Sequence, residues 1–163
     1  MLHLPPVEVS QSPEAKFREY LASRPKPQRC TKQQERMVRF IFAQHNHFDA
    51  ELLIDDMKRA GFRVSRATVY RTLTKLVDAG LLRPLELGPR MFYEHDYGYP
   101  QHEHLYCQQC GKVIEFQSEE IDALIRQVGR DNGFHASSHT FIVRGTCSEC
   151  NRARVMKRRL DLV

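Results

Sequence analysis

The sequence predicts a two-domain α+β protein. Four stretches with helix-capping residues lie between residues 12 and 80, and a strand-like hairpin pattern around Gly88-Pro89 follows them. Beyond residue 95, strand and helix patterns alternate in a shorter region that also holds two Cys-x-x-Cys pairs. We therefore expect an N-terminal winged helix-turn-helix domain at 1–95, a small α/β domain at 96–150 and a basic tail at 151–163.

The first two predicted helices open with recognisable caps. Ser12 precedes Pro13 as an N-cap, and the helix should run to about Ser23 before a Pro-Lys-Pro break. Thr31 with Gln34 forms a capping-box pattern at the start of the second helix. Both helices therefore have a defined start.

The third and fourth helices complete the helical part of the N-terminal region. Asp49 caps a helix that stops at Gly61, and Ser65 caps one that stops at Gly80. Apolar residues mark the inward faces of these helices: Leu52, Leu53 and Met57, then Val69, Leu73, Leu76 and Val77. Three helices followed by a hairpin are the element order of a winged helix-turn-helix, with the second of the paired helices placed to read DNA.

The second region reads as a small α/β unit. Residues 102–116 alternate like strands, residues 118–132 carry an apolar stripe at helical spacing, and residues 139–145 read as another strand. The stripe consists of Ile121, Leu124, Ile125 and Val128. Turn-forming residues at 96–101 predict a linker before this unit.

Charge is distributed unevenly along the chain. Residues 1–95 carry 16 Lys and Arg against 11 Asp and Glu, whereas residues 96–150 carry 4 against 8. This division suits a polyanion-binding region beside a cation-binding one. The N-terminus lacks a basic start followed by an apolar run, and no segment has the length of a membrane span, so we expect a cytoplasmic protein.

Four of the five cysteines form two Cys-x-x-Cys pairs. Such pairs can present four thiolates tetrahedrally, which is the closed coordination of a structural zinc ion, and disulfides are rare in a reducing cytosol. Gly111 and Asn151 follow the pairs and belong to residue types that tolerate the left-handed backbone of a metal knuckle. Redox-active dithiols and plain buried cysteines are the alternatives. The predicted zinc ligands are Cys107, Cys110, Cys147 and Cys150.

Histidines and carboxylates are dense near the predicted domain junction. On a strand, His102 and His104 point to the same face and can reach one cation. Nitrogen and oxygen ligands without cysteine suit ferrous iron, manganese or zinc. Solvated surface histidines are the alternative for any single member. The set comprises His47, Glu94, His95, His102, Glu103, His104, Glu115 and His139.

The helix after Ser65 has the composition of a DNA-recognition helix. Arg66, Tyr70 and Arg71 stand near its start, where a recognition helix reads base edges and contacts phosphates. A solvated cationic helix is the alternative, and the helix order with the following hairpin favours double-stranded DNA as the partner.

Several motifs together resemble the ferric uptake regulator (Fur) family. They are A-T-V-Y-R-T-L at 67–73, A-G-L at 79–81, H-x-H-L-x-C-x-x-C-G-K-V-I-E-F at 102–116 and C-x-x-C at 147–150. The resemblance implies a homodimeric repressor that binds pseudo-palindromic operators, with structural zinc on the four cysteines. It also implies a regulatory metal site on His47, Glu94, His102, His104 and Glu115.

The resemblance implies two further groups of functional residues. An additional family metal site maps onto Glu103, Asp122 and His139, although its remaining histidine is replaced here by Gln101. Thr31-Lys32-Gln33-Gln34 departs from the usual T-x-Q-R before the second helix. The expected DNA contacts are Arg29, Arg66, Thr68, Tyr70 and Arg71.

Family members sense different signals, and the ligand types favour one of them here. Zinc sensors tend to bring a thiolate into the regulatory site, and peroxide sensors usually carry Asp where Glu94 and Glu115 stand. We therefore expect ferrous iron as the regulatory metal, with zinc, manganese or peroxide sensing as alternatives. A zinc-dependent enzyme and a zinc-stapled interaction module are the rival classes, and we expect no enzymatic activity.

Overall fold

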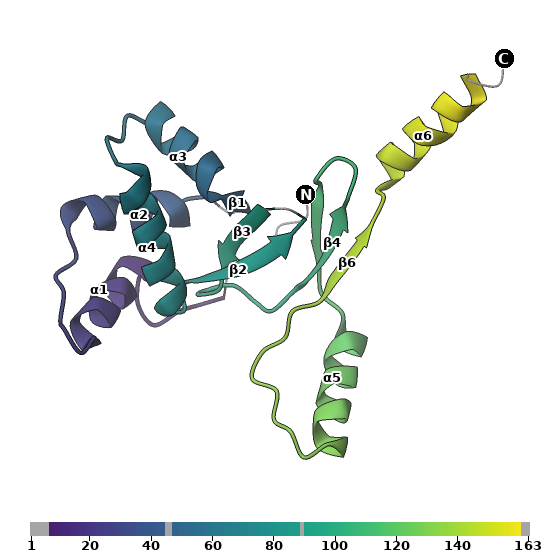
Figure 1. The fold of residues 1–163 in the computed structure, drawn as a ribbon. Helices are drawn as coiled ribbons and strands as arrows, with labels where there is room; N and C mark the ends of the chain where they lie inside the picture. The colour runs from purple at the N-terminus through teal and green to yellow at the C-terminus, as the bar shows by residue number, and fades with distance from the viewer. Residues whose placement is uncertain (1–6, 45–46, 89, 161–163) are drawn as a thin grey trace. The chain divides into compact units, whose positions relative to one another are not determined.

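The computed structural model describes residues 7–44, 47–88 and 90–160. The chain divides into two compact units, residues 5–100 and residues 101–163, which we call the N-terminal and C-terminal units. The finer limits at 95 and 150 stay a prediction. Figure 1 shows the elements of each unit.

The helices of the N-terminal unit begin where their caps predict. Each cap side chain accepts a hydrogen bond from a backbone N–H of the first turn, and the capping box of the second helix is complete. The caps are Ser12, Thr31, Asp49 and Ser65, and the helices are α1 (Pro13–Ser23), α2 (Lys32–Phe42), α3 (Ala50–Arg59) and α4 (Arg66–Asp78).

The described part of the N-terminal unit also contains a three-stranded antiparallel sheet. Strands β2 (Leu82–Leu87) and β3 (Arg90–His95) form the predicted hairpin, and the order is β1-β3-β2. The two-residue strand β1 (Phe48–Asp49) was not predicted from the sequence; it pairs with β3 just before α3 begins.

The N-terminal unit has a continuous hydrophobic core. Residues from α1 to β2 are buried in it: Phe17, Leu21, Met37, Ile41, Leu53, Ile54, Met57, Val69, Leu73, Leu76 and Leu82 among them. The expectation for Leu52 was wrong, because 45% of it is exposed. Ala50, Leu53, Ile54 and Met57 follow the i, i+3, i+4, i+7 pattern, and Leu52 lies off that stripe.

The C-terminal unit is built on a second three-stranded sheet. Strand β4 (Glu103–Cys107) lies in the middle, antiparallel to β5 (Val113–Phe116) and parallel to β6 (Ile142–Gly145). Helix α5 (Glu119–Asp131) connects β5 to the segment before β6, and Ser118 caps it. This unit and the winged N-terminal unit give the expected α+β fold.

Residues 151–160, within the predicted basic tail, are helical. Helix α6 (Ser148–Leu160) includes Cys150 in its first turn and follows β6 in Figure 1. The expectation of a left-handed backbone at Asn151 was wrong, since every described residue with positive φ is a glycine. Asn151 lies inside α6.

Apolar side chains lie on the surface of the C-terminal unit. Leu105, Ile114 and Val143 are paired neighbours on one face of the sheet and are about equally exposed. Other exposed apolar residues lie on α5, after it, or before β6: Leu124, Val128, Phe134 and Phe141. In the described part of the chain, no helix is both long enough and apolar enough to cross a bilayer.

Candidate metal centres and recognition surface

The four predicted zinc ligands lie together in the C-terminal unit. Cys107 ends β4, Cys110 follows in the turn, Cys147 precedes α6 and Cys150 lies in its first turn. Their sulfur atoms all lie within 4.8 Å of one another, and the Sγ atoms of Cys110 and Cys147 are 3.8 Å apart. The antiparallel turn after β4 and the parallel strand β6 thus bring the two Cys-x-x-Cys pairs to one place.

Backbone hydrogen bonds shape the first cysteine turn. Gly111 has φ of +74°, as expected, and its N–H donates to the Cys107 carbonyl at 2.9 Å. The Cys147 N–H donates to the Cys107 sulfur at 3.3 Å, which ties the two pairs together. Lys112 Nζ and a Glu149 oxygen, 3.0 Å apart, form an ion pair between the same two segments.

The cysteine environment separates the thiol pKa values. Backbone N–H groups of Cys147 and Cys110 lower the pKa of Cys107 to about 6 because they stabilise the thiolate. Hydrogen bonding with Cys147 and Cys110 and the charge on Cys107 raise the pKa of Cys150 to about 12. A second thiolate is therefore unfavourable beside the charged Cys107 sulfur, and a bound divalent cation would offset this repulsion.

This donor set fits zinc. Four thiolates in a closed cluster are a structural zinc ligand set, whereas a catalytic zinc site keeps one position open for water. The fit rests on the sulfur distances within one unit, because Cys107, Cys110, Cys147 and Cys150 each offer one donor within reach of the others.

A second group of metal-type ligands joins the sheet to α5. One oxygen each of Glu103 and Asp122 and one His139 nitrogen lie within 4.8 Å of one another. Glu103 is 2% exposed; one of its oxygens lies 3.2 Å from His139 Nε2, and the other, Oε2, is buried without a hydrogen-bond partner among the described residues. An orphaned buried carboxylate oxygen is costly in a protein interior, so this group suits a bound cation.

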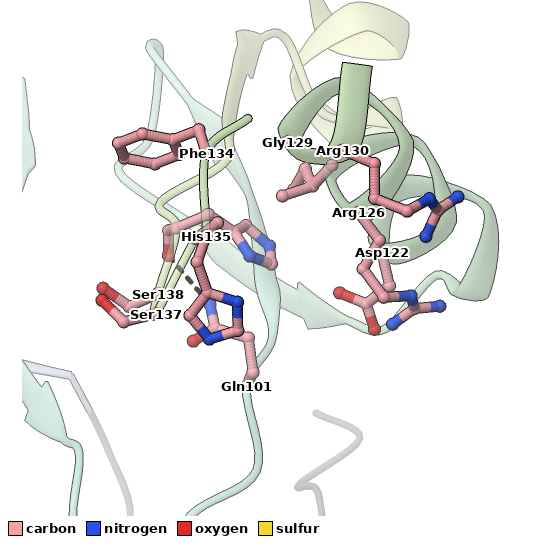
Figure 2. A pocket seen from close by; sticks show the side chains of 12 residues that line it. Gln101, Asp122, Arg126, Gly129, Arg130, Phe134, His135, Ser137 and Ser138 are labelled. Carbon is pink, nitrogen blue, oxygen red and sulfur yellow. Dashed lines mark hydrogen bonds between the residues drawn. The ribbon is translucent and has the colours of Figure 1, made fainter. Parts of the chain in front are cut away.

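Gln101 lies beside this group. Its Nε2 atom donates to the His139 carbonyl oxygen at 2.9 Å, so the amide holds the backbone of a ligand. Figure 2 shows Gln101 in a cavity of about 470 Å³ between α5 and residues 134–139, with Asp122 on the α5 side. Gly129 permits the close approach of this segment, since a Cβ there would lie 2.7 Å from the Phe134 carbonyl oxygen.

Two of the predicted regulatory ligands lie in the N-terminal unit. His47 precedes β1 and Glu94 lies in β3; His47 Nε2 is 3.1 Å from one Glu94 oxygen. Arg83 Nε donates to the other Glu94 oxygen at 2.6 Å. Glu94 is buried, and this arginine places a positive charge beside its carboxylate group. Sequence analysis did not single out Arg83, whose position opposite Glu94 in the hairpin is the signal that could have identified it.

The remaining regulatory candidates lie in the C-terminal unit. The rings of His102 and His104 have centroids 4.8 Å apart, and both residues are buried. Glu115 of β5 pairs with His104 of β4 in the sheet. The shared face of His102 and His104, predicted from strand alternation, agrees with this spacing. His95, by contrast, stacks on Phe42 and lies 3.2 Å from the Ile41 carbonyl oxygen, inside the N-terminal unit.

The expected DNA contacts lie mainly at the start of α4. Arg66, Tyr70 and Arg71 are exposed, and Thr68 is half-buried with its hydroxyl 2.9 Å from that of the cap residue Ser65. Arg29 is exposed in the segment before α2. Glu51 of α3, which sequence analysis missed, accepts hydrogen bonds from both Arg66 and Tyr70.

Comparisons with known proteins agree on one family. The model of the ferric uptake regulator family matches residues 26–144. The ferric uptake regulation protein of Neisseria gonorrhoeae is 35% identical over 114 residues, which are 68% of this chain and 78% of that protein. The peroxide-responsive repressor PerR of Staphylococcus aureus is 28% identical over 122 residues, 75% of this chain and 82% of the repressor.

A solved structure supports the fold. The Helicobacter pylori ferric uptake regulator superposes with a TM-score of 0.77 at 24% identity, over 91% of this chain and 97% of that one. At this identity the likeness concerns the fold.

Proposed function

The chain belongs to the ferric uptake regulator family, whose members are transcription regulators rather than enzymes, and from this premise we propose that it is an iron-responsive repressor. In this proposal a homodimer binds pseudo-palindromic operators in double-stranded DNA. The coarser function, a metal-responsive regulator, follows from the family itself.

The observation that carries the proposal is the way metal-type ligands divide between the two units. His47 and Glu94 belong to the unit that presents α4, whereas His102 and His104 belong to the unit with the cysteine centre. Each pair offers only two donors, fewer than a tightly held cation requires. We propose that both pairs, with Glu115, hold one cation.

Such a cation would act as a link that favours one arrangement of the units. A ligand shifts a conformational equilibrium only by its difference in affinity for the two states. When bound, the metal supplies a positive charge that nitrogen and carboxylate donors of both units share. Arg83 orients Glu94 through its hydrogen bond, and the β2–β3 hairpin fixes Glu94 relative to α4 within the N-terminal unit.

Ferrous iron is the metal that we propose for this site. His47, Glu94, His102, His104 and Glu115 supply only nitrogen and oxygen, and such sets bind iron, manganese or zinc according to availability. The relatives named for ferric uptake favour iron, and manganese, zinc and peroxide sensing are the alternatives.

Two further ions have structural roles in the proposal. Cys107, Cys110, Cys147 and Cys150 would hold zinc and stabilise the C-terminal unit. Glu103, Asp122 and His139 would hold an additional cation that pins α5 to β4, with Gln101 supporting the His139 backbone.

The exposed apolar face of the C-terminal unit supports a homodimer. Leu105, Ile114 and Val143 form a contiguous apolar strip on the sheet, and Leu124 and Val128 extend along α5. Soluble proteins cover such surfaces with another chain. Two-fold pairing would present two copies of α4 to the half-sites of a palindrome.

The decisive experiment couples metal binding to DNA binding through His102. We expect His102→Ala to need more ferrous iron for operator binding, with partial recovery at excess iron, because coupling free energies of about 1 to 3 kcal/mol are typical and reciprocal. Zinc content and dimerisation should persist. Anaerobic iron titrations followed by operator-binding assays measure both effects.

His135→Ala is the matched control, because His135 is an exposed histidine of the same unit outside the regulatory set. Its iron dependence should equal that of the wild-type protein. If His102→Ala also bound DNA with wild-type iron dependence, the regulatory site would lie elsewhere. Glu103, Asp122 and His139 would then be the next candidate.

A further inference from the structure

Glu51 connects the two helices of the helix-turn-helix at the surface proposed to read DNA. It lies in the first turn of α3, and one of its oxygens, Oε1, accepts two hydrogen bonds from α4. The donors are Arg66 Nη2 at 2.5 Å and Tyr70 Oη at 2.8 Å.

Both donors stand on the same face of α4. Arg66 is the first residue of the helix and Tyr70 lies four positions later, so their side chains are neighbours on the helix surface. Tyr70 is 45% exposed, and the Arg66 side chain is 63% exposed. The Glu51 oxygen therefore organises two side chains that remain open to a partner.

An exposed ion pair contributes little to folding stability, because solvent screens it. Folding stability therefore does not account for the position of Glu51. The carboxylate has two other physical effects at this place: it restricts the rotamers of an arginine and a tyrosine, and it offsets a positive charge on a surface that faces a polyanion.

These two effects act differently on specific and non-specific DNA binding. Non-specific affinity comes from positive charges that displace counterions from phosphates, so a paired guanidinium contributes less to it. Base reading depends on side chains held in one geometry, so fixing the rotamers lowers the cost of ordering them on the operator.

We propose that Glu51 is a positioning residue for DNA discrimination: it holds Tyr70 and Arg66 in the reading geometry and weakens binding to non-operator DNA. This inference rests on the proposed function of α4. The Glu51 carboxylate acts through the two α4 side chains and needs no DNA contact of its own.

The contact has a consequence for the titration of Tyr70 that can be measured without DNA. The hydrogen bond to Glu51 raises the pKa of Tyr70, because a carboxylate acceptor stabilises the protonated phenol. Arg66 opposes this rise by its charge, and Tyr93 adds to it. Removing the carboxylate should therefore lower the Tyr70 pKa.

The test compares Glu51→Ala and Glu51→Gln in the metal-loaded full-length protein. The probes are a duplex selected by the wild-type protein from a randomised DNA pool and a scrambled duplex of equal length. We expect Glu51→Ala to reduce the affinity ratio of selected to scrambled DNA about tenfold, the scale of one specific base contact. Glu51→Gln keeps an acceptor oxygen without the charge, so it should lose less of the ratio while binding scrambled DNA more tightly.

Asp55→Asn is the matched control. Asp55 lies on the same helix and pairs with Lys58 of α3, so this change removes the same charge without touching α4. Its affinity ratio should equal the wild-type value. Tyrosine absorbance titrations, with Tyr70→Phe to assign the signal, should show a lower Tyr70 pKa in Glu51→Ala and no change in Asp55→Asn.

Three possible results would each contradict a different part of the proposal. A wild-type protein that selects no sequence from the pool would contradict the proposed function and this inference with it. Selection by the wild-type protein, together with an unchanged affinity ratio in Glu51→Ala, would overturn the role of Glu51 alone. An unchanged Tyr70 pKa in that variant would overturn the contact on which the role depends.

Discussion

The two units differ in how they bury apolar surface. In the N-terminal unit α1–α4 and β2 enclose a core of aliphatic and aromatic side chains, several of them fully buried. Among the residues beyond 100 whose burial the structure describes, the buried side chains are those of His102, Glu103, His104 and Cys107, and Gly129 is buried as well. Burial of apolar area supports the first unit, whereas the buried side chains of the second are three ionisable groups and one cysteine.

This contrast implies two different sources of stability. Apolar burial contributes roughly 25 cal/mol per Å², and the continuous core of the N-terminal unit gives that unit this source of stability. A region of about 60 residues without such a core usually depends on metals, disulfides or oligomerisation. The C-terminal unit has the cysteine cluster and the exposed apolar strip that fit metal binding and pairing with a second copy.

Loss of the cysteine centre should therefore produce the largest difference in stability between the two units. We expect Cys107→Ser to unfold the C-terminal unit and abolish dimerisation, because structural zinc contributes about 10 kcal/mol or more in small zinc domains. Segment-resolved hydrogen exchange should show lost protection in β4–β6 and retained protection in α1–α4. Metal analysis and sedimentation complete the measurement.

Cys30→Ser serves as the control, because Cys30 lies in the N-terminal unit, outside the cluster. It should leave zinc content and dimerisation unchanged. A zinc-free Cys107→Ser protein that stays a folded dimer would show that the C-terminal unit does not depend on the metal.

Truncation of a buried side chain in the N-terminal core should instead destabilise the N-terminal unit and spare the C-terminal unit. Leu73 is fully buried in α4, and Leu73→Ala should destabilise the N-terminal unit by about 2 to 5 kcal/mol through lost burial and a cavity. Zinc content should be unchanged.

Leu124→Ala is the same substitution in the C-terminal unit, where Leu124 is 59% exposed. Its effect should appear in dimer dissociation rather than in hydrogen exchange from α1–α4. Equal effects of both variants on α1–α4 would contradict the independence of the units.

Local signals in the sequence predicted much of this architecture. Capping residues define helix starts through a single side-chain hydrogen bond, so Ser12, Thr31, Asp49 and Ser65 could be identified without tertiary information. The hairpin around Gly88 follows from turn chemistry in the same way. The cysteine spacing likewise predicted the ligand cluster that the structure brings together.

The features that were missed depend on tertiary context. A strand of two residues, Phe48–Asp49, exists only because β3 lies beside it. Helix α6 was not predicted within the basic tail, and its first turn contains Cys150 of the cysteine cluster. The pairing of Glu51 with α4 is a contact between helices that no spacing rule identifies, whereas the pairing of Arg83 with Glu94 follows from the hairpin register once that register is known.

The smallest predicted effect compares one substitution in both units. Ser65 and Ser118 are N-caps whose hydroxyl oxygens accept hydrogen bonds from the backbone N–H groups of Thr68 at 3.2 Å and of Ile121 at 3.3 Å. Loss of a serine cap costs about 1 kcal/mol. Ser65→Ala should therefore lower the melting temperature of the N-terminal unit by roughly 4 to 8 °C, the shift that 1 kcal/mol produces in a domain of this size.

Ser118→Ala removes the equivalent bond from α5, but its effect should depend on zinc. Metal binding adds to the stability of the folded C-terminal unit by mass action, so after the loss of about 1 kcal/mol the unit should stay folded at saturating zinc, but a larger fraction of it than in the wild-type protein should unfold as a chelator removes the metal. Zinc bound to the C-terminal unit should not stabilise the N-terminal unit. Ser65→Ala should therefore shift the thermal transition of the N-terminal unit equally at every zinc concentration. Thermal scans at graded zinc, read by segment-resolved hydrogen exchange, measure both. A Ser65→Ala shift that grew as zinc fell would mean that the N-terminal core also depends on the metal centre.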